Sequence, residues 1–158
     1  MPIDAFLKNQ PFQAFIKMDG IPGESTNAKH KGEIDVLAFS WNIKQSIGPG
    51  GGVPQVSDFS IVKHLDIASP PLFAAVCTGD HIASALLTVE SGSNAKGQSL
   101  FYKVTFTEVL VSSVAPSGGG GDQPTEQVSL SFAKAEIHFQ DAAGGSKVAT
   151  CDFSRGGQ

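Results

Sequence analysis

The chain has 158 residues and a formal net charge of −4, which is enough length for one domain, 1–158, with a substantial buried core. Only 16% of its residues are charged, below the roughly 25% of typical soluble domains. Such a composition is found both in turn-rich β proteins and in proteins that neighbouring subunits cover. The basic residues are scattered, which argues against nucleic acid as a partner, because that function requires a basic face.

An acidic residue, Asp4, stands near the start of the chain, where a signal peptide needs basic residues, and no apolar run has the length of a membrane span. We therefore expect synthesis in the cytoplasm, no membrane insertion, and any secretion to proceed without a signal peptide. A near-repeat follows, because residues 2–8 (PIDAFLK) match residues 11–17 (PFQAFIK). The first strand is predicted over Gln13–Met18, since this copy leads directly into the turn Asp19–Gly23.

The second predicted strand, Glu33–Gln45, changes the parity of its apolar residues midway. Successive strand residues point to opposite faces, so both faces of this strand are expected to be buried. The residues before the change are Ile34 and Val36; those after it are Leu37, Phe39, Trp41 and Ile43.

A third strand is predicted from Phe59 to Ile67, and one helix follows it. Ser69 is expected to cap the start of this helix, Pro70 and Pro71 suit its first turn, and Gly79 is expected to end it. The next strand contains the alternating apolar residues Ala83, Ala85, Leu87 and Val89.

The longest pattern is a strand–loop–strand from Lys103 to Gln140, around the glycine run Gly118–Gly121. Each arm changes parity once, which predicts a bulge or a strand that crosses between sheets. A short last strand is predicted over Val148–Phe153. Together these elements predict a mainly β fold, a closed or nearly closed β barrel of two sheets with one short flanking helix.

No motif predicts catalysis, a metal site or a cofactor site, so we expect a protein that is not an enzyme. The glycine runs lack the Gly-Lys-Ser/Thr ending of a phosphate loop. Cys77 and Cys151 are expected to be free, buried thiols. The histidines lie far apart, without metal-ligand spacing, and two of them alternate with apolar neighbours and are expected on outward strand faces. All four are His30, His64, His81 and His138, of which His64 and His138 are the alternating pair.

Several segments carry a resemblance to one family. They are Asp19–Ser25 (DGIPGES), Glu33–Trp41 (EIDVLAFSW), Glu108–Val114 (EVLVSSV), the glycine loop, and Thr125–Ala133 (TEQVSLSFA). In this order, over about Ala14–Phe139, they resemble Hcp, the haemolysin-coregulated protein family that forms the inner tube of bacterial type VI secretion systems. The resemblance implies a non-catalytic β barrel with a short helix. It also implies homohexameric rings that stack into a tube.

The resemblance further implies a VgrG-type spike, contractile sheath proteins and secreted effectors, some of them held in the ring lumen, as partners. A long loop after the second strand is expected to reach the neighbouring ring, and a second loop is expected at a ring edge. The first loop contains Ile47, Gly48, Pro49, Gly50, Gly51, Gly52, Val53, Pro54 and Gln55. The second contains Ser117, Gly118, Gly119, Gly120, Gly121 and Asp122.

The chain departs from the family at its two ends. The family has one copy of the opening strand, so residues 1–12 are expected to be an added arm, and residues 141–158 a short tail with no fused effector domain. The parity changes then predict that one stretch of each long arm packs the core and the other faces a neighbour or the lumen. An alternative function stays open, that of a monomeric β-barrel module which binds a small ligand or sugar.

Overall fold

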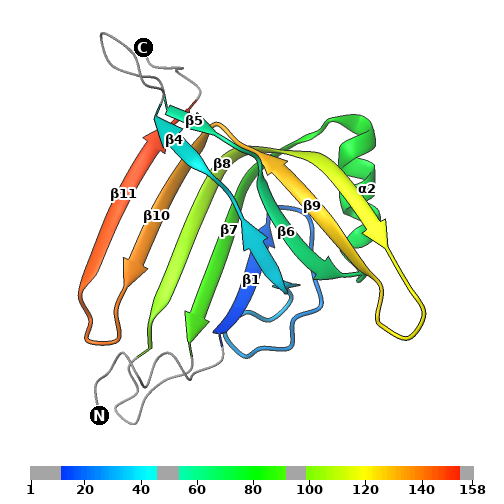
Figure 1. The fold of residues 1–158 in the computed structure, drawn as a ribbon, viewed down its shortest axis with the longest axis horizontal. Coiled ribbons are helices and arrows are strands. Elements are labelled where there is room, and N and C mark those ends of the chain that lie inside the picture. Colours follow the sequence, from blue (N-terminus) through cyan, green and yellow to red (C-terminus); the bar gives the residue numbers. More distant parts are fainter. Residues whose placement is uncertain (1–11, 46–53, 92–98, 154–158) are drawn as a thin grey trace.

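The computed structural model describes residues 12–45, 54–91 and 99–153. They form a strongly curved nine-stranded sheet, a separate two-stranded ribbon and one helix (Figure 1). The ribbon consists of β4 (Ile43–Gln45) and β5 (Pro54–Val56). The helix is α2 (Ser69–Thr78). The curved sheet consists of β1 (Phe12–Met18), β2 (Ile34–Val36), β3 (Ala38–Ser40), β6 (Phe59–His64), β7 (His81–Ser91), β8 (Phe101–Ser117), β9 (Thr125–Ser131), β10 (Lys134–Gln140) and β11 (Ser146–Asp152).

The main path of the sheet runs β2-β1-β7-β8-β9-β6-β3, with β10 and β11 branching from β8. Its two end strands, β2 and β3, are consecutive in the chain and are separated only by Leu37. The Leu37 N–H donates to the carbonyl of Val62 in β6, at 2.7 Å. The sheet therefore curls until its ends meet through the chain itself, but within the described residues no ladder of hydrogen bonds joins β2 to β3 or β6. The closed barrel accordingly stays a prediction.

The predicted irregularity in the first long arm is confirmed in β8. Its inward residues change parity between Phe106 and Val109, both fully buried, and Glu108 between them has a positive φ of 54°. Residues other than glycine rarely adopt this conformation, which bends a strand locally. Because the bend turns both halves of β8 toward the same interior, Val104 and Val111 also pack into one core. The expectation that only one half of this arm packs the core is therefore wrong.

The second long arm is two strands, with a break at Phe132 and Ala133 where its parity changes. β9 pairs with the second half of β8, from Leu110 to Ser117, and β10 pairs with the first half, from Phe101 to Thr107. β9 also pairs with β6, and β10 with β11, so the two halves carry different branches of the sheet (Figure 1).

Two predicted strand boundaries are wrong. The stretch Glu33–Gln45 is divided into β2, β3 and β4, because the chain passes there from one end of the curled sheet to the other and on into the ribbon. The third strand ends at His64, and Leu65 and Ile67 lie beyond it with 42% and 59% of their surface exposed. Apolar alternation continued past the true end of this strand, so pattern alone extended it.

The aromatic core lies inside the curled sheet. Phe106 packs against Phe59 and Phe132, with ring centroids 4.6 Å and 4.7 Å apart, and the edge of Trp41 meets it at 5.5 Å. Tyr102 lies at the margin of this cluster. Burial raises its pKa, and a hydrogen bond from Trp41 offsets part of that rise. Aromatic pairs in these tilted and edge-on arrangements stabilise a core beyond the area that they bury.

The helix ends as predicted but begins differently. Gly79 adopts the left-handed conformation (φ 71°), and its N–H donates to the carbonyl of Ala75. The N-cap residue is Ala68 rather than Ser69, which is the first helical residue. The Ser69 hydroxyl is engaged elsewhere, since it donates to Glu126 Oε1 at 2.7 Å and accepts the N–H of Asp66 at 3.0 Å.

A buried ionic cluster attaches the start of the helix to the sheet. Lys63 in β6 is fully buried, and its Nζ lies 2.5 Å from Glu126 Oε1 of β9 and 2.8 Å from Asp66 Oδ1. Its ammonium group also reaches the Ser69 hydroxyl at 3.3 Å. One cation thus meets two carboxylates and a hydroxyl away from water, where an unpaired charge is very costly.

The C-terminal region is part of the sheet. Within residues 141–158, predicted as a tail, β11 pairs with β10 along its whole length, from Ser146 to Asp152. The predicted last strand is thereby confirmed; it begins two residues and ends one residue earlier than expected. The cysteines are free as predicted, but neither is buried, since Cys77 is exposed and Cys151 is intermediate.

Candidate interaction surfaces

An apolar stripe on the segment 37–43 is the clearest candidate for a binding surface. Leu37, Phe39 and Ile43 keep 53%, 36% and 43% of their surface exposed, whereas Ile34 and Val36 on the other face are buried. The sequence pattern predicted burial of both faces, and the single subunit buries the second only in part, because Phe39 stacks on Phe59 and Tyr102 while Leu37 and Ile43 stay exposed. We call Leu37, Phe39 and Ile43, with the half-buried Trp41, the Leu37 stripe. Contiguous exposed apolar surface of this kind marks a protein interface or a ligand groove.

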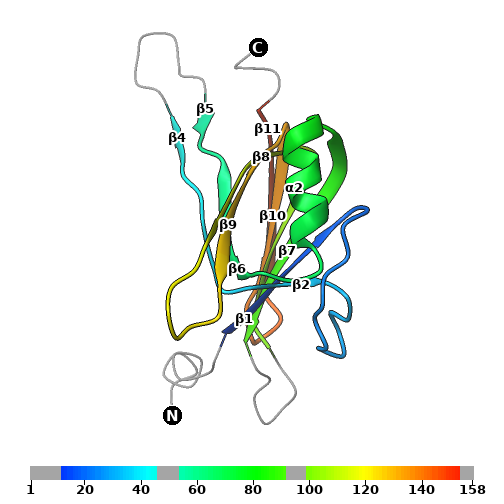
Figure 2. The same cartoon turned by 90° about the vertical axis from the view of Figure 1, so that its right-hand side faces the viewer.

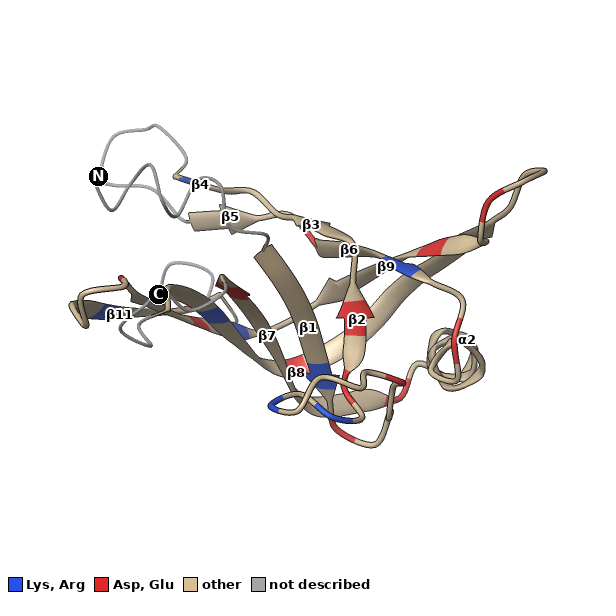
Figure 3. Ribbon diagram, turned by 90° about the horizontal axis from the view of Figure 1, so that it is seen from below, with Lys and Arg blue, Asp and Glu red and all other residues tan. Residues whose placement is uncertain are grey.

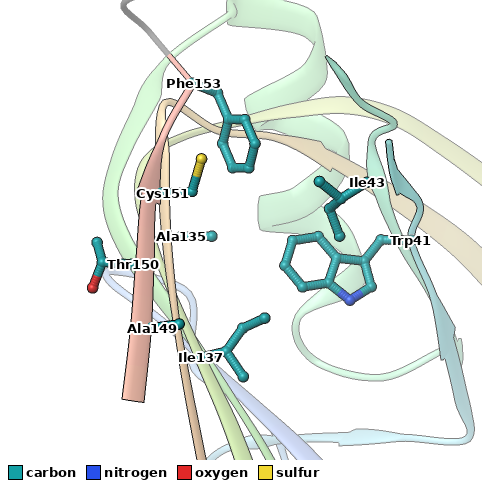
Figure 4. Close-up of a pocket in the computed structure, with 8 residues that line it drawn as sticks. All are labelled: Trp41, Ile43, Ala135, Ile137, Ala149, Thr150, Cys151 and Phe153. Atoms are coloured by element: carbon teal, nitrogen blue, oxygen red, sulfur yellow. The ribbon is translucent and has the colours of Figure 1, made fainter. Parts of the chain in front are cut away.

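An apolar cleft lies beside this stripe (Figure 4). Trp41 and Ile43 point across it toward Ile137 and Phe153, which come from β10 and the residue after β11. Its volume is about 190 Å³, below the roughly 300–1,000 Å³ of typical ligand pockets. Sugar recognition needs convergent polar groups, and the lining offers the Thr150 hydroxyl, the Cys151 thiol and the Trp41 indole N–H, of which the last is already hydrogen-bonded to Tyr102. The cleft therefore does not favour the ligand-binding alternative.

The first predicted loop lies mostly outside the described residues, which exclude 46–53. Its last two members, Pro54 and Gln55, belong to β5 and pair with Gln45 and Lys44 of β4. The loop therefore connects the strands of the β4–β5 ribbon. This ribbon projects from the sheet at the end of the molecule where β11 ends (Figures 1 and 2).

The second predicted loop connects β8 to β9. Ser117 is the last residue of β8, and Gly118 to Asp122 form the exposed turn, in which Gly121 has a φ of 103°. This turn lies at the opposite end of the molecule from the β4–β5 ribbon (Figures 1 and 2). The structure thus separates the two predicted loops rather than joining them in one site.

The histidines have environments that favour structural roles. His30 stacks on Phe15, and its two ring nitrogens lie 3.1 Å from Glu33 and 3.2 Å from Glu90, so it joins the loop before β2 to β7. His64 and His138 are half-buried on strands β6 and β10. Among the described residues no hydroxyl or thiol is hydrogen-bonded to a histidine ring, and no group of three potential metal ligands comes together.

Charge is spread over the fold. Lysines and acidic residues are interspersed on separate elements (Figure 3), with no continuous basic face over the part of the chain that is described. Within that same part, no helix is long and apolar enough to cross a membrane. The distinctive surfaces of this molecule are therefore apolar ones and open strand edges.

Comparison with known proteins identifies the class to which such a molecule belongs. Residues 15–139 match the family model described as "Type VI secretion system effector, Hcp". Protein hcp1 of Pseudomonas aeruginosa is 40% identical over 133 residues, which cover 80% of this chain and 82% of that protein. The crystal structure of Hcp1 from Salmonella typhimurium is similar, with a TM-score of 0.79 and 35% identity over 92% of this chain and 96% of the other.

A second solved structure agrees with the first. It is described as a type VI secretion system effector from Yersinia pestis, and it has a TM-score of 0.73 and 34% identity, covering 88% of this chain and 98% of the other. The molecule is therefore a type VI secretion system protein. It belongs to the Hcp family of secreted structural proteins, as the segments around Asp19, Glu33, Glu108 and Thr125 predicted.

Proposed function

We propose that the protein is the repeating subunit of a hexameric ring, and that these rings stack into the inner tube of a type VI secretion system. The exposed Leu37 stripe carries the proposal, because its sequence has the pattern of a buried face that one subunit leaves uncovered. A neighbouring copy would bury the part of it that the subunit itself leaves uncovered. The number six is what membership of the Hcp family implies.

The open strand edges fit a ring in which one surface of each subunit meets a different surface of the next. β11 pairs only with β10, and β3 pairs only with β6, so each leaves one edge without a partner strand among the described residues. Such edges pair readily with another chain. Heterologous contacts close into a ring when the rotation between copies allows it.

The positions of the two Gly-rich loops fit stacking along the ring axis. The β4–β5 ribbon, whose two strands the first loop joins in sequence, and the turn Ser117–Asp122 lie at opposite ends of the subunit (Figure 2). A ribbon at one end can contact the next ring, and a turn at the other end can receive it. In this proposal the tube bears a VgrG-type spike, lies inside contractile sheath proteins and carries effectors in its lumen. The subunit leaves the cell with the tube, without a signal peptide, and its curled sheet closes as a barrel.

The mass of the native protein tests the ring. Native mass spectrometry at tens of micromolar should give six times the 16.4 kDa of one chain. The variant Leu37→Asp should fall apart into smaller species, because it places a charge within a buried contact, while Leu37→Met should keep the hexamer. A wild-type protein that stays monomeric at this concentration would overturn the proposal.

Charge in the first loop should separate ring formation from stacking. The double variant Gly50→Asp/Gly51→Asp is expected to keep hexamers but to form fewer stacked tubes, since the added charges would lose water at the contact with the receiving turn, which itself carries Asp122. Electron microscopy of concentrated protein would count rings and tubes. The neutral double variant Gly50→Ser/Gly51→Ser should stack as the wild type does. Loss of the rings themselves in the charged variant would contradict the assignment of this loop to stacking.

A further inference from the structure

An open apolar groove lies where the described chain begins. Its walls come from the start of β1, the β2–β3 connection and the end of β7, and its volume is about 300 Å³. Phe12 and Leu37 each keep 53% of their surface exposed there. We call it the β1 groove; its lining residues are Phe12, Gln13, Ala14, Val36, Leu37, Ala38, Phe39 and Val89.

The chain itself supplies a segment of matching chemistry. Eleven residues precede Phe12, and they contain the near-copy of β1, in which Ala5, Phe6 and Leu7 stand where β1 has Ala14, Phe15 and Ile16. In β1 the last two of these residues are buried. The N-terminal copy thus carries the apolar pattern of a strand that packs against this same sheet.

Distance and attachment favour the chain's own groove. Residues 8–11 separate Leu7 from Phe12, and a chain of this length spans up to roughly 14 Å when extended. Phe12 lines the groove, so the arm leaves from the groove wall itself. A segment attached by so short a link has an effective concentration in the millimolar range, which a separate molecule rarely matches.

A strand edge is also available at this place. β3 is an end strand of the sheet, and the edge that does not pair with β6 has no partner strand among the described residues. Two β3 residues, Ala38 and Phe39, line the groove. An extended segment can add to such an edge through main-chain hydrogen bonds, while its alternate side chains enter the adjacent apolar groove.

We propose that the N-terminal copy, residues 3–7, docks in the β1 groove of its own chain, where Phe6 enters the groove and covers Leu37. The arm adds a short strand beside β3. The arm covers the Leu37 end of the stripe within one chain, so in the proposed ring the neighbouring copy meets Ile43 and the outer side of the docked arm rather than Leu37 itself.

Disulfide trapping tests the placement. In a background of Cys77→Ser/Cys151→Ser, the pair Ala5→Cys/Ala38→Cys is compared with Ala5→Cys/Ala83→Cys. Ala83 is exposed on β7, six residues from Val89 in the groove wall, and therefore roughly 20 Å along the strand. Mild oxidation and mass spectrometry under denaturing conditions should give at least tenfold more cross-link for the Ala38 pair, within one chain. Equal yields for both pairs, or a product that contains two chains, would overturn the proposal.

A labelling experiment tests the anchors without disturbing the described fold. With Leu37→Cys as the single thiol, Phe6→Ser/Leu7→Ser should speed its reaction with a maleimide at least fivefold, because the covering side chain of Phe6 is lost. The control Lys8→Gln in the same arm should leave the rate unchanged. An equal rate in the Phe6→Ser/Leu7→Ser and Lys8→Gln proteins would mean that the arm does not cover Leu37.

Discussion

The substitution Lys63→Met is expected to lower the free energy of unfolding by about 3–5 kcal/mol, because it leaves Glu126 as a buried carboxylate without its cation. Glu126 is 2% exposed, and Lys63 is its nearest charged partner at 2.5 Å. The loss should extend to helix α2, since the same cluster holds Ser69 at the start of the helix. Chemical denaturation measures this loss in the free energy of unfolding. Both proteins are compared at the same concentration, so that subunit association contributes equally to each.

Two companion variants separate the ionic effect from simple loss of a side chain. Lys63→Met/Glu126→Gln removes both charges and should be more stable than Lys63→Met alone, because no unpaired charge stays buried. Lys134→Met, at an exposed position of β10, should change stability by less than about 0.5 kcal/mol. If Lys63→Met proved as harmless as Lys134→Met, the cluster would have no stabilising role.

The substitution Phe106→Ala is expected to cost about 3–5 kcal/mol, the usual effect of deleting a fully buried aromatic ring. Phe106 is 0% exposed and contacts three aromatic rings. Phe59 lies in β6, Phe132 between β9 and β10, and Trp41 between β3 and β4. A cavity there would therefore loosen both branches of the sheet at once. Thermal unfolding followed by circular dichroism would show a lower transition temperature.

Phe73→Ala is the matched control for this second prediction. Phe73 lies on helix α2 with 64% of its surface exposed, so its removal should change the stability by less than about 0.5 kcal/mol. Phe106→Leu, which keeps most of the apolar volume, should fall between the two. Equal stability of the Phe106→Ala and Phe73→Ala proteins would contradict the placement of the core.

Alternation of apolar residues predicted most strands but not their ends. It located β7 and the bend in β8, because each of these strands has one face against the core. It also located β11, although this strand pairs at the sheet margin and has no buried residue. It extended β6 to Ile67, since an apolar residue beyond a strand looks the same as one within it. It also treated 33–45 as one strand, because local pattern contains no information about which distant strand each residue pairs with.

The ionic cluster was missed although the sequence holds a signal for it. Phe59, Ile61 and Lys63 occupy successive inward positions of β6, so strict alternation alone places Lys63 inside. Its partner, Glu126, lies inward on β9 by the same rule. The two side chains meet because Lys63 lies opposite Glu126 in the pairing of β6 with β9. The sequence does not reveal which strands pair or in which register.

The surface that carries the proposed function was predicted in part. The parity change at Leu37 correctly indicated a second apolar face, but whether that face lies in the core or against another molecule depends on the curl of the whole sheet. The exposed fractions of Leu37 and Phe39 decide this point for the single subunit.

The single residue between β2 and β3 also bears on the order in which the molecule folds. β2 can pair only when β1 is in place, and β3 can pair only when β6 is in place. The first pair joins the sheet through β7 and the second through β9, and β7 and β9 lie on either side of β8. Leu37 therefore reaches its position only after both ends of the sheet have formed. This requires contacts between distant parts of the chain, so we expect the junction to form late in folding. We expect the same junction to open readily when the native protein fluctuates, because the two ends of the sheet meet there without a ladder of hydrogen bonds among the described residues.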